Sequence, residues 1–448
     1  QFGSVMILAR LLSPHDYGLI GLITIFITVS EVICDSGLAG AVIKKKDAQI
    51  IDFSTLFVYN IVVSLILFVV LFLCAPLLDS FYNEECLSSL LRLYSVVLIL
   101  HALAIVPRTY MMKQCMFKEL SIITTFSNFL GIIVAIILAY CGYGPYSIIW
   151  QHIVYSAFLN VFALAKTNYR IRWGFSITSF KEQFSFGINT TIAGALKNVT
   201  ENIFNNVVGK GASVVHSGYY AQGSKVMQVP VSFFHSLIDT TYFPVLSQIQ
   251  DQTDFCNKVK ELNVKTLGCI ILIFIFLIPN SREIIYILLG EKWLDCEWTL
   301  TILFISGLFI TWGNIGRNVI KCTGKTFLIL VYEFIVFVLA MVGLFLTYEL
   351  GYDAIVLFFL CVSVVKSVLV NYIGCRELKI SIWDSLKPIW GFVVSMLVIC
   401  GILSFVSIDN IYFSLLAKLG ITLLCLTPLL LAYRDIIIAF FRRRKISK

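Results

Sequence analysis

Long apolar runs recur along the whole chain and are separated by short polar stretches. Representative runs cover residues 56–76, 122–140, 270–278, 327–347 and 392–406. Several approach the roughly 20 apolar residues that a helix needs to cross a bilayer. The pattern predicts about fourteen membrane-spanning helices, near residues 1–12, 17–42, 52–78, 88–107, 119–140, 146–165, 186–208, 218–245, 262–279, 296–316, 326–348, 353–373, 388–407 and 412–433. Because Gln1 lies inside an apolar run, we expect the first helix to be truncated.

Composition supports a membrane protein. The 448 residues are 59% hydrophobic and 13% charged, whereas soluble domains are about 25% charged. A soluble core could not hide that much apolar surface. The expected fold class is therefore an all-α polytopic membrane protein. Thirteen cysteines and five histidines are scattered without CxxC or zinc-ligand spacing, which favours packing residues over a metal site.

Basic residues are concentrated in alternate loops. One set of loops, together with the C-terminal tail, holds 24 of the 34 Lys and Arg residues, and the opposite loops hold three. The basic set comprises residues 44–46, 108–118, 166–181, 258–260, 317–325, 376–387 and 434–448. By the positive-inside rule this set, including the C-terminus, is cytoplasmic. The net charge of +8 therefore reflects topology and does not indicate a nucleic-acid partner.

The loops are too short for a soluble catalytic or nucleotide-binding domain. The chain also lacks the GxxxxGK[ST] phosphate-binding motif. We therefore expect no nucleotide, no cofactor and no catalytic residues.

The two halves of the chain resemble each other at a nearly constant shift. DYGL (16–19) and SGYY (217–220) each open a span, Asp35 precedes Asp239 by 204 residues, and LAYCGYG (138–144) precedes LTYELGY (346–352) by 208. An even number of spans in each half predicts parallel repeats. The expected architecture is two pseudo-symmetric six-helix bundles, at 1–175 and 176–375, followed by two further helices and a basic tail at 376–448.

Three predicted spans have polar residues at helical spacing, which suggests a polar cavity between the bundles because a polar face is improbable against lipid. The second span has Thr24, Thr28, Glu31 and Asp35; the seventh has Thr190, Gly194, Lys197, Glu201 and Asn205; the eighth has Gln222, Lys225, Gln228, Ser232, His235 and Asp239.

Several motifs resemble polysaccharide exporters of the O-antigen and teichuronic acid flippase type. These are ARLLSPHDYGLIGL (9–22), DSGLAGAVIKKKD (35–47), SFGINTTIAG (185–194), SGYYAQGSKVMQVP (217–230), FPVLSQIQD (243–251) and LLGEKW (288–293). That family shares a superfamily with multidrug extruders and the lipid II flippase. The resemblance implies flipping of a polyprenyl-pyrophosphate-linked oligosaccharide across the bacterial inner membrane. It also suggests membrane lipid and polysaccharide polymerase and assembly proteins as partners.

On this reading the cations Arg10, Lys197 and Lys225 attract the pyrophosphate, and Gln222, Gln228 and His235 line the cavity. The carboxylates Glu31, Asp35, Glu201 and Asp239 bind a proton or cation that couples transport to an ion gradient.

Plainer interpretations remain open at this stage. Lys197 and Glu201 can pair with each other, and Glu31 and Asp35 can lie at a wetted interface. Lysines 44–46 are expected to be topology signals, so that losing one leaves transport nearly intact, and His101 and His152 are expected to be packing residues. The competing functions are a multidrug/cation antiporter of the same fold, a lipid II flippase and a membrane enzyme of polysaccharide assembly.

Overall fold

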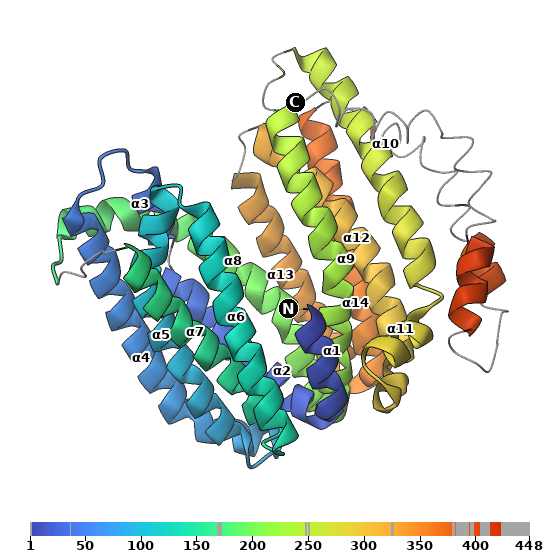
Figure 1. Cartoon of the computed structure of the whole chain (residues 1–448). Helices are drawn as coiled ribbons and strands as arrows, with labels where there is room; N and C mark the ends of the chain where they lie inside the picture. Colours follow the sequence, from blue (N-terminus) through green and yellow to red (C-terminus); the bar gives the residue numbers. More distant parts are fainter. Residues whose placement is uncertain are drawn as a thin grey trace. The chain divides into compact units, whose positions relative to one another are not determined.

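The computed structural model is helical throughout the residues that it describes, which are 2–35, 37–167, 173–246, 249, 251–323, 327–378, 381, 394, 398–403 and 413–422. Those residues contain no β-strand. The chain divides into two compact units, Gln1–Ala221 and Gln222–Lys448, whose helices are labelled in Figure 1.

The first unit contains α1 to α8 and the start of α9. The helices are α1 (Phe2–Leu11), α2 (Pro14–Asp35), α3 (Leu38–Lys44), α4 (Ile50–Tyr82), α5 (Leu87–Lys113), α6 (Phe117–Tyr140), α7 (Tyr146–Thr167), α8 (Ile177–Gly211) and α9 (Val214–Leu246). Local signals fix several ends. Gly37, at φ 64°, separates α2 from α3, and Asn83, also left-handed, ends α4. The Ser176 hydroxyl accepts the Ser179 N–H and caps α8.

The second unit contains the rest of α9 and a group of helices up to residue 377. They are α10 (Gln252–Leu277), α11 (Ser281–Leu288), the short 3₁₀ helix η1 (Glu291–Cys296), α12 (Glu297–Cys322), α13 (Phe327–Thr347), η2 (Tyr348–Leu350) and α14 (Tyr352–Glu377). The chain bends by 73° between α10 and α11, where Pro279 interrupts the helix.

The long apolar helices confirm the predicted fold class. Among the described residues, eight helices are long and apolar enough to cross a membrane, or nine if the bent α10–α11 pair is one span. Large apolar side chains face outward on them, for example Leu73 at 71% and Phe345 at 83% exposure. Such exposure suits hydrocarbon and not water.

Each of the first twelve predicted spans falls on a helix, and the last two fall largely outside the described residues. The total of fourteen therefore stays a prediction. The helices α8 and α9 are long enough to span a membrane. They are not among these eight helices, because polar residues interrupt their apolar runs.

The predicted boundary at 175/176 also stays a prediction. In the structure α8, expected to open the second bundle, packs against α2, α3 and α4 in the first unit.

Buried charges join helices within the second unit. The Glu333 carboxylate on α13 accepts from Arg317 on α12 and lies 3.7 Å from the Lys366 ammonium on α14. The Lys418 ammonium lies 2.5 Å from Glu283 on α11 and ties the short apolar helix Phe413–Thr422 to the bend. Each carboxylate is buried, and pairing offsets the cost of that burial.

Glycines allow α2, α8 and α9 to approach closely within the first unit. A Cβ on Gly218 would meet the Pro14 carbonyl oxygen, and a Cβ on Gly18 would meet that of Val214. Gly18 lies near the start of α2 and Gly218 near the start of α9. We call these two contacts the glycine crossing. It brings the backbones of the two helices together near their first turns.

We predict that Gly18→Ala and Gly218→Ala each lower stability by about 1–3 kcal/mol, because backbone oxygens cannot move aside without displacing a helix. Thermal unfolding of the purified protein in detergent measures the change. Gly40→Ala is the matched control, since nothing lies within 4 Å of its added Cβ. Equal melting temperatures for all three variants would contradict a tight crossing.

Candidate functional site

The polar stripe of α2 begins with hydroxyls that are satisfied locally. Thr24 donates to the Ile20 carbonyl at 2.7 Å, and Thr28 donates to the Thr24 carbonyl at 3.0 Å. These bonds follow the helix backbone and leave the carboxylates as the distinctive groups of the stripe. Glu31 is half-buried, whereas Asp35 is exposed at the last residue of the helix.

Glu31 lies near titratable residues of α5 that the sequence did not connect with it. The carboxylate lies within Coulombic range of His101 and Arg108, and Arg108 Nη1 lies 3.4 Å from His101 Nε2. Tyr94, seven residues before His101, belongs to the same stripe of α5. The expectation that His101 is a packing residue and not a ligand stays a prediction. The sequence signal for this polar stripe was the seven-residue spacing of Tyr94, His101 and Arg108.

His152, by contrast, has an aromatic neighbour. Its ring centroid lies 5.4 Å from that of Tyr94.

On α8 the charged candidates pair with each other. Lys197 Nζ lies 3.7 Å from Glu201 Oε1, with side chains 44% and 51% exposed. The open alternative of an i,i+4 pair is thus what the structure shows. Neighbouring amides on α8 donate to backbone carbonyls four residues earlier, as Asn198 does to Gly194 and Asn202 to Asn198. Nothing is described for the Thr190 side chain. Arg10, the remaining candidate in this unit, is exposed on α1.

The candidates on α9 in the second unit differ in burial. Gln222 is fully buried, and neither amide atom of its side chain has a hydrogen-bond partner in the described part of the chain. Lys225 and Gln228 are exposed, and His235 is half-buried. The predicted single polar face is therefore partly turned inward at Gln222.

Asp239 has partners that the sequence did not predict. Its Oδ1 accepts from Asn318 Nδ2 at 2.6 Å and from Asn314 Nδ2 at 3.3 Å, both on α12. The two asparagines are one helical turn apart, so they present adjacent amides to one carboxylate.

A network of charged and polar side chains joins the start of α4 to the start of α8. Lys45 Nζ lies 3.0 Å from Asp52 Oδ1 and 3.1 Å from Glu182 Oε2. The buried Asp52 also accepts from the Ser179 hydroxyl and from the Gln49 N–H. We call this set the Lys45 network. Both carboxylates favour the charged ammonium and raise the pKa of Lys45 above its ordinary value of 10.5.

The Lys45 network corrects the reading of lysines 44–46 as topology signals only. Lys45 is the cation of a buried carboxylate, Asp52, which is 1% exposed. The nearby Lys113 donates to the carbonyls of Val42 and Lys45 and holds the same loop. Sequence reasoning missed these partners because Lys45 and Glu182 are 137 positions apart.

At their other ends α4 and α8 meet again. Tyr82 Oη donates to Asn206 Oδ1 at 2.9 Å. Lys210 donates to the Phe81 carbonyl, and its ammonium lies 4.6 Å from the centre of the Phe81 ring. Polar contacts therefore join α8 to α4 near both ends.

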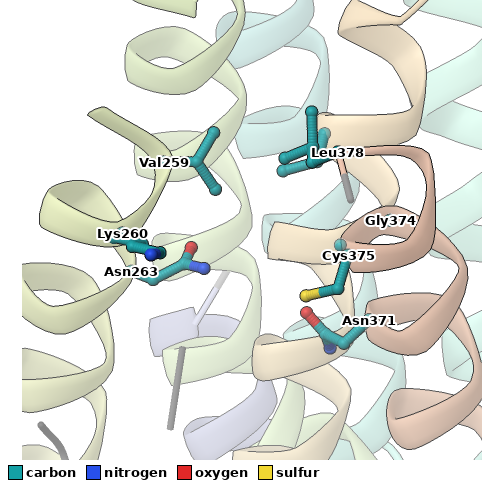
Figure 2. Close-up of a pocket in the computed structure, with 9 residues that line it drawn as sticks. Val259, Lys260, Asn263, Asn371, Gly374, Cys375 and Leu378 are labelled. Atoms are coloured by element: carbon teal, nitrogen blue, oxygen red, sulfur yellow. The ribbon is translucent and has the colours of Figure 1, made fainter. Parts of the chain in front are cut away.

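A small cavity lies within the second unit where α10, α12 and α14 meet. Figure 2 shows Lys260 and Asn263 of α10 on one side and Asn371 and Cys375 of α14 on the other. The cavity volume is about 10 Å³, which is room for about one water molecule. This space is too small for a substrate.

The described residues contain no group of three or more His, Cys, Asp or Glu side chains that could hold a metal ion. The candidates instead form separate polar groups. Glu31, Asp35, Lys197 and Glu201 lie in the first unit, and Gln222 to Asp239 lie in the second.

Comparison with known proteins assigns the chain to a family. The family model described as "Polysaccharide biosynthesis protein" matches residues 7–297. The chain belongs to this family.

Curated relatives include an uncharacterized membrane protein in the cps region of Klebsiella pneumoniae, 27% identical over 68% of this chain and 64% of that protein. The teichuronic acid biosynthesis protein TuaB of Bacillus subtilis is 24% identical over 88% of this chain and 82% of its own. The lipopolysaccharide biosynthesis protein WzxC of Escherichia coli is 23% identical over 69% of this chain and 63% of its own. The match to the first of these thus spans slightly less than two thirds of that relative's length.

Solved structures share the fold. The lipid II flippase MurJ in an inward closed conformation has a TM-score of 0.76, at 16% identity, over 97% of this chain and 98% of that one. An inward-facing multidrug resistance MATE transporter has a TM-score of 0.63, at 11% identity, over 84% of this chain and 93% of that one. This member of the polysaccharide biosynthesis family therefore shares its fold with both proteins.

We predict that Lys45→Gln destabilises the protein by about 1–2 kcal/mol, because it removes a charge-assisted bond from buried Asp52. In an Asp52→Asn background the same substitution costs much less, so a double-mutant cycle on thermal unfolding gives a non-additive result. Lys46→Gln is the control, since Lys46 is exposed and has no recorded partner in the described residues. Additive costs would show that Lys45 and Asp52 are uncoupled.

The pKa of Lys45 sets the pH dependence of this contribution. Because the folded-state pKa is raised, the stabilisation is complete below the ordinary lysine value and is lost only as pH rises through the raised value. We therefore expect the loss of unfolding free energy caused by Lys45→Gln to be the same at about pH 6 and at about pH 8.

Proposed function

We propose that the chain flips a polyprenyl-pyrophosphate-linked oligosaccharide across the bacterial inner membrane by alternating access. The observation that supports this most is the family match over residues 7–297. The names of relatives add teichuronic acid and lipopolysaccharide biosynthesis and, for ExoT of Rhizobium meliloti, succinoglycan biosynthesis transport. The substrate class therefore comes from these relatives, and the fold of MurJ supports a flipping mechanism.

A multidrug/cation antiporter is the second candidate, and the fold of the MATE transporter is what favours it. The polysaccharide relatives favour the flippase. Accumulation of lipid-linked oligosaccharide in a deletion strain, reversed by the cloned gene, tests the proposal. Normal glycan export together with drug sensitivity in that strain would support the antiporter instead.

We assign the candidate residues to two roles. Arg10, Lys197 and Lys225 attract the pyrophosphate, and Gln222, Gln228 and His235 contact the oligosaccharide. Lys197 pairs with Glu201, so this carboxylate and the pyrophosphate compete for one ammonium group.

The carboxylates Glu31, Asp35, Glu201 and Asp239 form the ion-coupling set. Glu31 has no hydrogen bond or ion pair among the described residues, although His101 and Arg108 lie within Coulombic range. Asp239 is already held by two amides. Such carboxylates on membrane helices are costly and usually functional.

The contacts at both ends of α8 suggest how access is controlled. The Lys45 network closes one end of the α4–α8 contact, and the Tyr82–Asn206 bond closes the other. Alternating access requires that the two ends of a path do not open together. We propose that these contacts open in turn.

Polysaccharide polymerase and assembly proteins are proposed partners, because the chain belongs to a polysaccharide biosynthesis family.

We predict that Asp35→Asn and Lys225→Gln each lower transport about tenfold, equivalent to the loss of one charge-assisted bond of about 1.5 kcal/mol. Transport is measured as glycan export in the complemented deletion strain, with protein level checked by immunoblot. Asp47→Asn and Lys46→Gln are matched controls, because both residues are exposed in the loop after α3. Full activity of Asp35→Asn would leave Asp35 a structural residue.

We predict that the basic loops and the C-terminus lie in the cytoplasm. Alkaline phosphatase fused after Asn83 should be active, and green fluorescent protein fused after Lys448 should fluoresce. The reverse pattern would overturn the assigned orientation.

A further inference from the structure

An apolar groove runs along the outer surface of α6 and α7 in the first unit. It is lined by Ile122, Ile123, Phe126, Phe162, Ala165 and Lys166, and its volume is about 330 Å³. The rings of Phe126 and Phe162 lie 5.6 Å apart and form part of its wall. Ile122 and Phe126 are largely exposed, so the groove opens to the surroundings of the protein.

Lysines mark one end of this groove. Lys166 lines it directly, one residue before the end of α7. Lys118 lies in the first turn of α6, four residues before Ile122 and eight before Phe126, which places the three on one face of the helix. One helical turn is about 5.4 Å, so Lys118 lies about one turn beyond Ile122 toward the start of α6.

Both lysines are exposed, and neither has a recorded hydrogen bond or ion pair in the described part of the chain. Glu119 is the one acid beside them on α6. It lies four residues before Ile123, which packs into the buried cluster with Leu120 and Ala163 and also lines the groove, so Glu119 lies toward the inner wall of the groove end. Two exposed lysines against this one half-buried carboxylate leave the groove end with a net positive charge.

We propose that this groove binds an anionic phospholipid of the surrounding bilayer. One acyl chain lies along Ile122, Phe126 and Phe162, and the headgroup phosphate lies near Lys118 and Lys166. The apolar walls supply non-directional burial for a chain, and the two ammonium groups supply the charge that a phosphate requires.

Charge complementarity and the position of the opening select this occupant. A bilayer phospholipid reaches the outer surface without entering the protein, and a lysine near an anionic leaflet gains favourable electrostatic energy. The inference rests on the membrane location of the chain and is independent of which substrate the protein moves.

Lipid binding to the purified full chain in detergent tests the proposal. Native mass spectrometry measures occupancy as phosphatidylglycerol or phosphatidylcholine is titrated. We expect wild type to prefer phosphatidylglycerol. Lys118→Gln and Lys166→Gln should each weaken phosphatidylglycerol binding about fivefold, with little change for phosphatidylcholine.

Two further variants separate the charge from the groove. Ala165→Phe fills the groove while leaving both lysines, so it should weaken both lipids; Ala165 is exposed, so folding is not at risk. Lys46→Gln removes an exposed lysine elsewhere and should change nothing.

Equal binding of the two lipids, or an unchanged preference in the Lys118→Gln/Lys166→Gln double variant, would overturn the site. Displacement of phosphatidylglycerol by a polyprenyl phosphate at much lower concentration would also overturn it, because the occupant would then be a carrier lipid.

Discussion

In the first unit the backbones of α2 and α9 approach each other closely at the glycine crossing. At Gly18 and Gly218 a single added carbon would overlap a carbonyl oxygen of the facing helix. Such contact matters in a membrane because lipid chains are as apolar as leucine, so helices associate by close packing and polar bonds and not by exclusion of water. Gly209 and Gly21 extend the crossing toward α8, where their added carbons would meet Leu22 and the Asn205 amide.

Polar contacts also join helices of the first unit away from the glycine crossing. The helix α8 meets α4 through the Lys45 network at its first turns and through Asn206 and Lys210 near its end. Between these ends its amides and hydroxyls bond to its own backbone, as Thr200 does to Leu196 at 2.8 Å. A membrane-length helix can therefore be polar without a partner for each side chain. Lys197 and Glu201 remain as the charged pair that this arrangement leaves exposed.

The sequence predicted what depends on local periodicity. Apolar runs placed the first twelve predicted spans on helices, the second of them on α2 and α3 together. It could not predict pairings between distant residues. The Lys45–Glu182 and Asp239–Asn318 contacts join positions 137 and 79 apart, and nothing in either local pattern specifies the partner. For the same reason it could not foresee that Gln222 turns inward while Lys225 is exposed.

The distribution of satisfied and unsatisfied polar groups separates structural residues from functional candidates. Asp52 accepts from a lysine, a serine hydroxyl and a backbone N–H, and Glu333 and Glu283 each have a cation; these paired carboxylates join helices of the fold. Glu31 differs, because its neighbours His101 and Arg108 bond to each other and not to it. An acid on a membrane helix with cations nearby but no bond to them has lost solvation without full compensation. A state of the proposed transport cycle in which Glu31 gains a partner, a proton or a cation would explain that cost, and it makes Glu31 the member of the proposed ion-coupling set with the clearest physical basis.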